Sequence, residues 1–428
     1  MRAVVVGAGV SGAFAADALR TRFGQELDVH VLERDTRIGG RAHRRALAGV
    51  EVEAGASLFH SSNRLLSQSC AALGLGLVRA DTAGTMGIWD GSRIVFQTSG
   101  RRGRDTLLLL SRYRLPLLRA GRDVKQLIRR LEQVYPRLER GDSWDGPQQL
   151  LGELGLYPLS QRAAADHFAS GRFTTEFLDG VSRNNYAQVR DELNALVELV
   201  SLAGAGLGGG SLLHVAQGNA AIPAGLLTRA AAGVRTGATV HRIERERSTW
   251  RVSGAGFGTL VADIVILAGP LEHSGIELPS VPAPPHRDLV VVHVTIIRGT
   301  LCADAIGGAR PVPGFVLSTA AAGSVLSVER LADTDTGAIY KVFSTELLAD
   351  PVLDRFFEAS EVIRTVWDAY PRLAPTAAWP DFRLGPGLYY TGAMEYAVST
   401  METQAIAGVA SANLAAKESN GPGVARHR

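Results

Sequence analysis

The chain has 428 residues, of which 46% are hydrophobic and 20% charged, so it can bury a large core and is neither a disordered nor a fibrous protein. Its 45 basic and 42 acidic residues give a formal net charge of +3, and the arginines stand beside acidic residues, which argues against nucleic acid as a partner. Only three basic residues are lysines and none lies in a GxxxxGK[ST] loop, which excludes a P-loop ATPase or kinase.

The two cysteines, Cys70 and Cys302, lie far apart in the sequence, which excludes a disulfide framework and favours a reducing compartment. The chain reaches a glycine loop by Gly7 and has no apolar run near the roughly 18 residues of a spanning helix. We therefore expect a cytoplasmic protein without a secretory signal or a transmembrane segment. The sequence has no HExxH motif and no GxSxG motif, so neither a metal site nor serine hydrolysis is expected.

The first predicted elements are a buried strand over residues 2–6, a glycine loop, and a helix. The loop reads GAGVSG, which is the GxGxxG pattern in its usual place between strand and helix. Its first glycine permits the turn, its second lets backbone approach a pyrophosphate, and its third lets the helix pack on the strand. The start of the helix then offers free N–H groups to the phosphates. The loop residues predicted to bind the dinucleotide are Gly7, Gly9, Val10, Ser11 and Gly12.

A second strand is predicted over residues 27–32 and leads to Glu33, 21 residues after Gly12. An acid at this place binds the ribose hydroxyls of a dinucleotide and argues against NADP. A second glycine pair with an arginine follows, Gly39-Gly40-Arg41, and favours another backbone approach to the same pyrophosphate, with Arg41 supplying charge. This arrangement favours FAD over NAD.

The run ERDTRIGGR that begins at Glu33 resembles the ERxxRxGGR segment of the flavin amine oxidase superfamily. Later stretches resemble the prenylcysteine oxidase (prenylcysteine lyase) branch of it. They read EAGASLFHSS from residue 53, SWDGPQQLLGELGL from 143, FLDGVSRNNYAQ from 177, and LYYTGAMEYAVSTMETQ from 388. Because they occur in the right order over nearly the whole chain, the protein is identified as a member of that family.

The resemblance implies an α/β fold, with a Rossmann-like FAD domain of the two-dinucleotide-binding type and a discontinuous α+β substrate domain. It implies that small residues after Glu53 lie against the flavin, and that the backbone of Met401 faces the flavin O2 and N1 edge. Thr400 or Ser399 is expected to cap the helix that begins there. The further cofactor contacts implied by the resemblance are Arg34, Gly55, Ala56, Ser57, Val240, Gly269, Gly392, Glu395, Thr400 and Met401.

The FAD domain is then expected to comprise residues 1–58, 212–275 and 385–417, and the substrate domain residues 59–211 and 276–384. The first insertion is mainly helical in pattern, with arginine-rich helices that we interpret as a solvated face; peripheral contact with an anionic membrane surface is the alternative. The second insertion has strand-like runs that suit an antiparallel sheet. Residues 418–428 are predicted to be a flexible tail.

The resemblance also implies a reaction, the oxidation of an S-prenyl or S-alkyl cysteine or a related peptide thioether. A hydride leaves the carbon next to sulfur for the flavin, water adds, and the hemithioacetal collapses to a thiol and an aldehyde. Dioxygen then takes the electrons and becomes hydrogen peroxide. Because sulfur stabilises the cation, no strong protein base is required. The side chains proposed for the catalytic pocket are His60, Tyr186 and Tyr390.

Several alternatives stay open at this point. Amine oxidases usually place a lysine near flavin N5, and the sequence does not show whether Lys341 reaches it. Neither cysteine lies in the C-terminal flavin segment, so FAD is expected to be noncovalent. The chain can also be another oxidoreductase of the superfamily, such as an amine oxidase or desaturase, or an FAD-bound interaction subunit without turnover. The sequence does not predict the oligomeric state.

Overall fold

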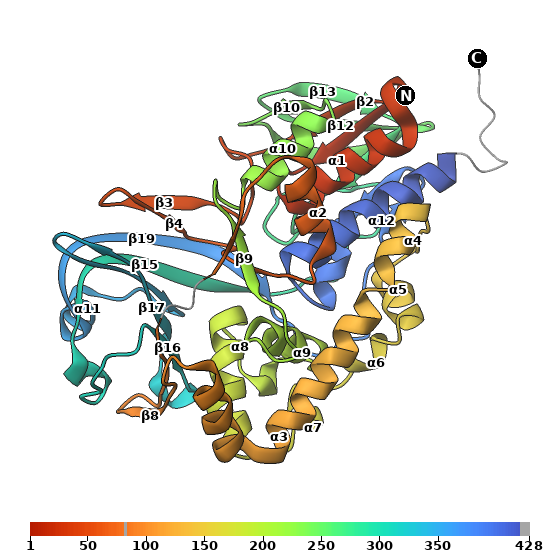
Figure 1. Cartoon of the computed structure of the whole chain (residues 1–428). Coiled ribbons are helices and arrows are strands. Elements are labelled where there is room, and N and C mark those ends of the chain that lie inside the picture. Colours follow the sequence, from red (N-terminus) through yellow and green to blue (C-terminus); the bar gives the residue numbers. More distant parts are fainter. Residues whose placement is uncertain (81–83, 420–428) are drawn as a thin grey trace.

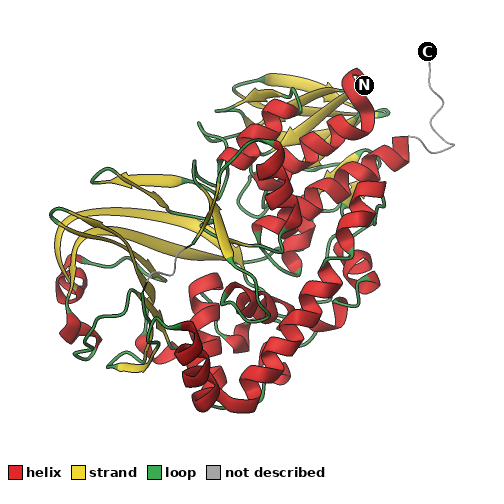
Figure 2. Cartoon of the chain, in the orientation of Figure 1, coloured by secondary structure: helices red, strands yellow, loops and turns green. Residues whose placement is uncertain are grey.

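The structure is a computed structural model that describes residues 1–80 and 84–419. Figure 1 shows two parts side by side, one around the N-terminus and one built from a long sheet with helices beneath it. Figure 2 shows that the helices gather along one side of the molecule, whereas the longest strands extend away on the other. Within the described residues, no helix is both long and apolar enough to cross a membrane.

A six-stranded sheet with the order β10-β2-β1-β14-β21-β20 forms the centre of the first part. All neighbouring strands are parallel except the pair of β20 and β21. The central strands are continuous apolar runs because both faces of this sheet are covered. The strands are β1 (Arg2–Val6), β2 (Asp28–Leu32), β10 (Gly233–Arg235), β14 (Ile264–Leu267), β20 (Arg383–Gly385) and β21 (Leu388–Tyr390).

Helices cover one face of this sheet (Figure 1), and the small sheet β11-β12-β13 contacts its central strands β1 and β14. Helix α1 crosses α12 so closely that a Cβ on Gly408 would lie 2.3 Å from the carbonyl oxygen of Ser11. The glycine therefore lets the two helices meet backbone to backbone. The elements are α1 (Val10–Phe23), α2 (Arg64–Ala72), α10 (Ala221–Arg229), α12 (Met401–Ser419), β11 (Thr239–Glu246), β12 (Thr249–Ala255) and β13 (Gly258–Ala262).

The second part is built on a seven-stranded sheet with the order β19-β15-β18-β17-β16-β7-β8. Its pairs are antiparallel, as predicted for the second insertion, except that β16 runs parallel to β7. Three of its strands had not been predicted, and two of these, β7 and β8, come from the insertion interpreted as mainly helical. The strands are β7 (Met86–Trp89), β8 (Ile94–Gln97), β15 (Leu289–Leu301), β16 (Phe315–Ser318), β17 (Val325–Thr334), β18 (Gly337–Ser344) and β19 (Phe357–Pro371).

Among the helices of the first insertion, α8 packs on β16 and β17 of this sheet, whereas α4 packs on α12. The longest, α3, continues past Pro116 and bends at Arg114, whose φ of 51° is outside the helical region. Asn194 caps α9 by accepting a hydrogen bond from the N–H of Val197 at 3.0 Å. The helices are α3 (Arg102–Leu131), α4 (Val134–Arg140), α5 (Pro147–Glu153), α6 (Tyr157–Ser160), α7 (Ala164–His167), α8 (Asp179–Tyr186) and α9 (Ala195–Gly204), with α11 (Asp350–Phe356) next to β19.

Short strands connect the two parts: β3 (Arg44–Leu47) with β4 (Val50–Glu53), and β9 (Leu212–Val215) between β5 (Phe59–His60) and β6 (Leu77–Arg79). Strands from all three predicted segments of the FAD domain lie in the six-stranded sheet, and the exact domain boundaries stay a prediction. The predicted tail begins too early, because α12 continues to Ser419 and Glu418 accepts a hydrogen bond from the Tyr389 hydroxyl at 2.7 Å. The rest of that tail, residues 420–428, lies outside the described residues.

Candidate cofactor and active site

A cavity of about 520 Å³ opens at the carboxyl ends of β1, β2 and β14. Ligands of open α/β sheets bind at this end of the strands. The cavity extends from the loop after β2 and the start of β11 to the end of β19 and the start of α12. Both parts of the molecule therefore contribute to its wall.

Two glycine loops face each other in this cavity. Gly9 precedes α1 without a side-chain cap, and the next three N–H groups have no acceptor among the described residues. A Cβ on Gly40 would lie only 3.2 Å from the Cα of Gly9, and Gly40 has a φ of 57°. The backbone of both loops can thus approach one bound group, and helix N–H groups of this kind bind phosphate.

Glu33 connects the loop after β2 to the first glycine loop. Its Oε2 accepts a hydrogen bond from the N–H of Ala8 at 2.7 Å, and its Oε1 accepts one from Asp35 at 2.9 Å. The side chain is buried, yet it lines the cavity beside Val240. This carboxylate therefore holds the glycine loop in place and also faces the space where a ribose hydroxyl would bind.

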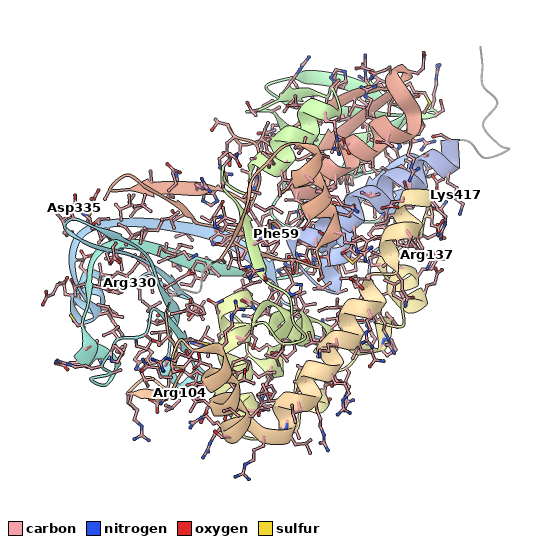
Figure 3. The ribbon with its side chains drawn as sticks, viewed as in Figure 1. Phe59, Arg104, Arg137, Arg330, Asp335 and Lys417 are labelled. Carbon is pink, nitrogen blue, oxygen red and sulfur yellow. The ribbon has the colours of Figure 1, made fainter. Side chains whose placement is uncertain are left out.

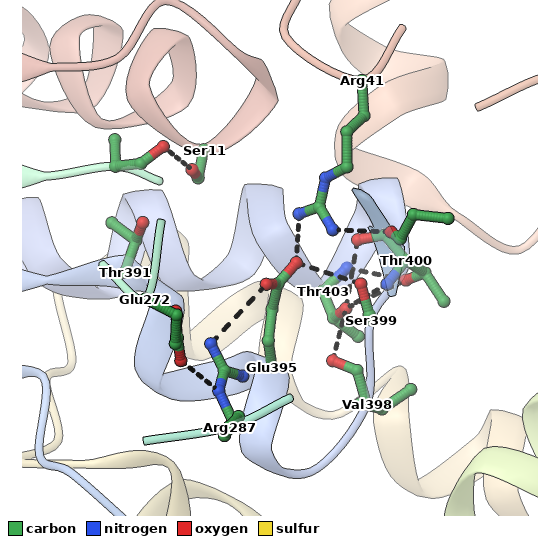
Figure 4. Close-up of polar contacts among 12 residues, drawn as sticks. Ser11, Arg41, Glu272, Arg287, Thr391, Glu395, Val398, Ser399, Thr400 and Thr403 are labelled. Carbon is green, nitrogen blue, oxygen red and sulfur yellow. Dashed lines mark hydrogen bonds and ion pairs between the residues drawn. The ribbon is translucent and has the colours of Figure 1, made fainter. Parts of the chain in front are cut away.

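An ion network centred on the buried Glu395 reaches the cavity wall through Arg41 and Glu395 (Figure 4). Arg41 donates to the Glu395 carboxylate and, at 3.0 Å, to the carbonyl of Ala369 at the end of β19. On the other side of Glu395, Arg287 lies 4.0 Å away and also pairs with buried Glu272 at 2.6 Å. Glu395 thus lies between two guanidinium groups that come from segments far apart in the chain.

The charges of this network decide its protonation. Burial alone raises the pKa of Glu395, but Arg41 and Arg287, with a hydrogen bond from Ser399, outweigh burial and hold that pKa below its ordinary value. The guanidinium of Arg287 also stacks over the ring of Tyr396, 4.0 Å from its centroid. Glu395 is therefore ionised at neutral pH and keeps Arg41 at the cavity wall.

Helix α12 begins at the cavity. Thr400 caps it, because its hydroxyl accepts a hydrogen bond from the N–H of Thr403 at 3.0 Å, whereas the Ser399 hydroxyl donates to Glu395 at 3.0 Å. The N–H groups of Met401 and Glu402 have no acceptor among the described residues. They lie at the positive end of a 19-residue helix, so they favour a negative group in the cavity.

A buried lysine lies beside the small-residue turn that follows β4. The Nζ of Lys341, on β18, is 3.4 Å from the hydroxyl of Ser57 and 3.0 Å from a carboxylate oxygen of Glu329. Ser57 itself donates to the carbonyl of Gly55 at 2.9 Å, next to Ala56 in the cavity lining. The structure thus brings a lysine to this turn, which the sequence could not show.

Most of the residues predicted to bind the cofactor line this one cavity. Gly12 does not, because it serves the packing of α1: a Cβ there would lie 2.0 Å from the carbonyl oxygen of Gly7. Gly55 and Ser57 also lie behind the lining, and a Cβ on Gly55 would lie 1.9 Å from the carbonyl oxygen of Arg41. The predicted residues in the lining are Gly7, Gly9, Val10, Ser11, Glu33, Arg34, Gly39, Gly40, Arg41, Ala56, Val240, Gly269, Gly392, Glu395, Thr400 and Met401.

The three side chains predicted for the catalytic pocket do not line the cavity. The His60 ring bonds to the Ser62 hydroxyl at 2.7 Å and to the carbonyl of Gly209 at 2.8 Å, so it holds a glycine-rich loop. Tyr186 is buried behind the cavity and packs edge-on against Tyr370, which does line it. Tyr390 is fully buried, with its hydroxyl 3.5 Å from a nitrogen of Arg287.

Sequence reasoning missed the far wall of the cavity. The end of β19 contributes five consecutive residues, 366–370, and the mixed pattern of exposed and buried positions along this strand gives no sign of a ligand. Arg287 directly follows a proline-rich stretch, residues 280–286, which gives no sign of a buried ion network. A signal existed for the turn after β14, where the apolar strand ends in Gly269-Pro270. The missed lining residues include Leu271, His273, Val366, Trp367, Asp368, Ala369, Tyr370 and Gln404.

The cavity fits a dinucleotide such as FAD. It offers a ribose acid in Glu33, two glycine loops that a Cβ would fill, and the free N–H groups at the starts of α1 and α12. The end formed by Ala56, Tyr370 and Met401 is the one on which the resemblance places the flavin. In residues 1–80 and 84–419, no group of three or more His, Cys, Asp or Glu side chains is arranged to hold a metal ion.

Comparison with solved structures identifies the fold. The chain superposes on cyclohexylamine oxidase from Brevibacterium oxydans with a TM-score of 0.68 and 18% identity, covering 97% of this chain and 99% of that one. It superposes on wild-type putrescine oxidase with a TM-score of 0.62 and 17% identity. The predicted α/β fold with a Rossmann-like dinucleotide-binding domain is therefore confirmed.

Sequence comparison extends over nearly the full length. A farnesylcysteine lyase of Arabidopsis thaliana is 29% identical over 94% of this chain and 86% of its own length. Prenylcysteine oxidase 1 of Homo sapiens is 28% identical over 97% of this chain and 89% of its own length. An NAD(P)-binding Rossmann-like domain model matches residues 5–73, and the prenylcysteine lyase model matches residues 96–422. The chain belongs to the prenylcysteine lyase family.

Proposed function

We propose that the chain is an FAD-dependent oxidase that cleaves a thioether, with an S-prenyl or S-alkyl cysteine, free or within a peptide, as its substrate. The observation that carries the proposal is family membership over residues 96–422, in a chain whose glycine loops and helix starts meet in one cavity. The names of its relatives, farnesylcysteine lyase and prenylcysteine oxidase, favour an S-prenyl substituent.

FAD held in this cavity would supply the acceptor for a hydride from the carbon next to sulfur and the route of its electrons to dioxygen. The chain's own residues would bind and orient the cofactor. Glu33 would receive the ribose hydroxyls, the two glycine loops would hold the phosphates, and the N–H groups at the start of α12 would favour negative charge at the far end of the cavity. We propose that FAD is noncovalent, since neither Cys70 nor Cys302 lines the cavity. The cytoplasmic localisation stays a prediction.

The proposal is tested by mixing the flavin-loaded protein with candidate substrates without oxygen and following the visible flavin absorbance. We expect farnesylcysteine to bleach the flavin and to release a thiol and an aldehyde. The matched control is the analogue in which a methylene group replaces sulfur, which should leave the flavin oxidised because no sulfur lone pair stabilises the cation. Equal bleaching by both compounds would contradict thioether chemistry.

Lys341 favours one competing function, oxidation of an amine. It is buried beside the turn on which the resemblance places the flavin, where amine oxidases also use a lysine. A panel of primary amines, tested on the unchanged protein and on Lys341→Met, separates amine oxidation from thioether oxidation. Lys417→Met, which changes an exposed lysine, is the control variant. Amine turnover that is lost only in Lys341→Met, with no response to any thioether, would replace the leading proposal.

A further inference from the structure

The positive charge of the chain is concentrated in one segment. Residues 101–130 contain ten basic and two acidic residues, a net charge of +8, whereas the whole chain has a net charge of +3. The rest of the molecule is therefore negative overall. This segment consists of α3 and the residue before it, and it forms the lower rim of the molecule in Figure 1.

The basic side chains of this segment are exposed and lack acidic partners. Arg112 is the exception, because it pairs with Glu176 at 2.7 Å. None of the other nine has an ion pair within the part of the chain that the structure describes; eight of them are exposed, whereas Arg130 is half-buried and donates to the carbonyl of Gly155. Arg104 extends from the lower edge in Figure 3. Charges left uncompensated on a folded surface point to an anionic partner. The eight are Arg101, Arg102, Arg104, Arg114, Arg119, Arg122, Lys125 and Arg129.

Large apolar side chains are exposed among these arginines. Leu107 is 69% exposed, Leu118 53% and Leu115 50%. Leu115 and Leu118 lie at the bend of α3, next to Arg114 and Pro116, so they protrude at the corner of the helix. Leucines on an outward corner contribute nothing to the core, and solvent exposure costs free energy.

The two halves of α3 have an outer and an inner face. After the bend, Leu118, Arg122 and Lys125 lie on the outside, three or four residues apart, while Val124 and Leu127 on the other face are buried against the protein. The helix is thus amphipathic in an unusual way, since its solvent face carries both cations and leucines. That combination is typical of helices that lie in a lipid interface.

We propose that this basic elbow, residues 101–129, docks the protein on an anionic lipid bilayer. The arginines contact lipid phosphates, and the three leucines enter the boundary between headgroups and acyl chains. The charge favours an anionic partner over a neutral one, and the protruding leucines favour a bilayer over nucleic acid, whose backbone offers them no apolar contact. The proposal is independent of the substrate and of the reaction.

Flotation of the flavin-loaded full chain with vesicles tests the proposal. We expect binding to vesicles of phosphatidylcholine with phosphatidylglycerol, little binding to phosphatidylcholine alone, and release in about 1 M salt, where the screening length falls to ~3 Å. Arg119→Gln with Arg122→Gln and Lys125→Gln should weaken binding about 100-fold, from the loss of three cations near the surface. Leu115→Ser with Leu118→Ser should weaken it about tenfold.

Matched controls keep the number and kind of changes but move them elsewhere. Arg235→Gln with Arg247→Gln and Arg355→Gln removes three exposed arginines, and Leu347→Ser with Val352→Ser removes two exposed apolar side chains. Both should bind vesicles as the unchanged protein does, and the flavin spectrum verifies folding of every variant. Equal binding to both kinds of vesicle, equal loss in controls and elbow variants, or binding to duplex DNA without binding to anionic vesicles would overturn the proposal.

Discussion

Glu395 and Glu198 are both completely buried carboxyl groups, but the two halves of the molecule surround them differently. Glu395, in the cavity wall, lies between Arg41 and Arg287, and its pKa is below the ordinary value. Glu198, in α9, has no hydrogen bond to either carboxylate oxygen among the described residues, and burial raises its pKa well above the ordinary value. The cavity wall thus favours the charged form of its carboxyl group, whereas burial in the helical half favours the neutral form.

Arg287→Met should have the largest effect on stability, because it removes one of the two guanidinium groups beside Glu395. We expect it to lower the unfolding free energy by roughly 3–5 kcal/mol, because Glu272 then stays buried without its cation and Glu395 keeps only Arg41. Urea unfolding measures the loss. Arg298→Met is the matched control: its partner Glu361 is 46% exposed, so the cost should stay within about 1 kcal/mol. Similar losses of unfolding free energy in Arg287→Met and Arg298→Met would show that the ion network around Glu395 stabilises the protein no more than a surface ion pair does.

The pH dependence of the unfolding free energy separates the two buried carboxyl groups further, beginning with Glu198. Because the folded pKa of Glu198 is raised, the stability linked to its proton is complete below the ordinary pKa of 4.5 and is lost as the pH rises toward the folded pKa. Glu198→Gln has no titrating group at this position and so does not lose this stability. The difference in unfolding free energy between the variant and the unchanged protein should therefore grow in favour of the variant by roughly 1.4 kcal/mol per pH unit between the two pKa values. Unfolding curves at several pH values measure it.

Glu395→Gln should show the opposite trend. Its folded pKa is lowered, so the carboxylate contributes stability above the ordinary pKa of 4.5 and loses it as the pH falls through the folded pKa. The cost of Glu395→Gln should therefore be largest near neutral pH and shrink in acid. Parallel pH profiles for Glu198→Gln and Glu395→Gln would contradict the assignment of one charged and one neutral carboxyl group.

Substitutions of two helix caps, one in each of the same two regions, should have the smallest effects on stability. Thr400→Ala removes the cap of α12 and should cost about 1 kcal/mol. Asn194→Ala removes the cap of α9 and also leaves the carbonyl of Ala397 without its donor, whereas the carbonyl of Leu373 keeps the backbone N–H of residue 194, so it should cost roughly 2–3 kcal/mol. Thermal unfolding measures both. A larger cost for Thr400→Ala would indicate that α12 depends more on its cap than on packing.

The N-terminal part of the cavity was predictable because its signals are local. Gly7 to Gly12 and Glu33 belong to one strand–helix–strand unit, whose backbone conformation depends on residues a few positions apart. The start of α12 was predictable for the same reason, since Thr400 caps three residues ahead. The predicted antiparallel strands of the second insertion also form one sheet, because their alternating apolar residues need a common covered face.

The substrate side was harder to predict. Strand β19 has a mixed pattern of exposed and buried positions, because its free edge and outer face meet solvent, so its sequence did not indicate a strand. His60, Tyr186 and Tyr390 were proposed from neighbouring sequence, but their hydrogen bonds and packing place them outside the cavity lining. Side-chain direction depends on partners that come from elsewhere in the chain.

The sequence by itself determined the glycine loops, the ribose acid, the helix that begins at Met401 and the family. The first three follow from backbone conformations and contacts over short separations, and the family follows from stretches that occur in order along the chain. The tertiary structure alone decided that Arg287 and Arg41 hold Glu395 between them and that Lys341 reaches Ser57. These arrangements join residues many positions apart, and only packing of the whole chain places them together.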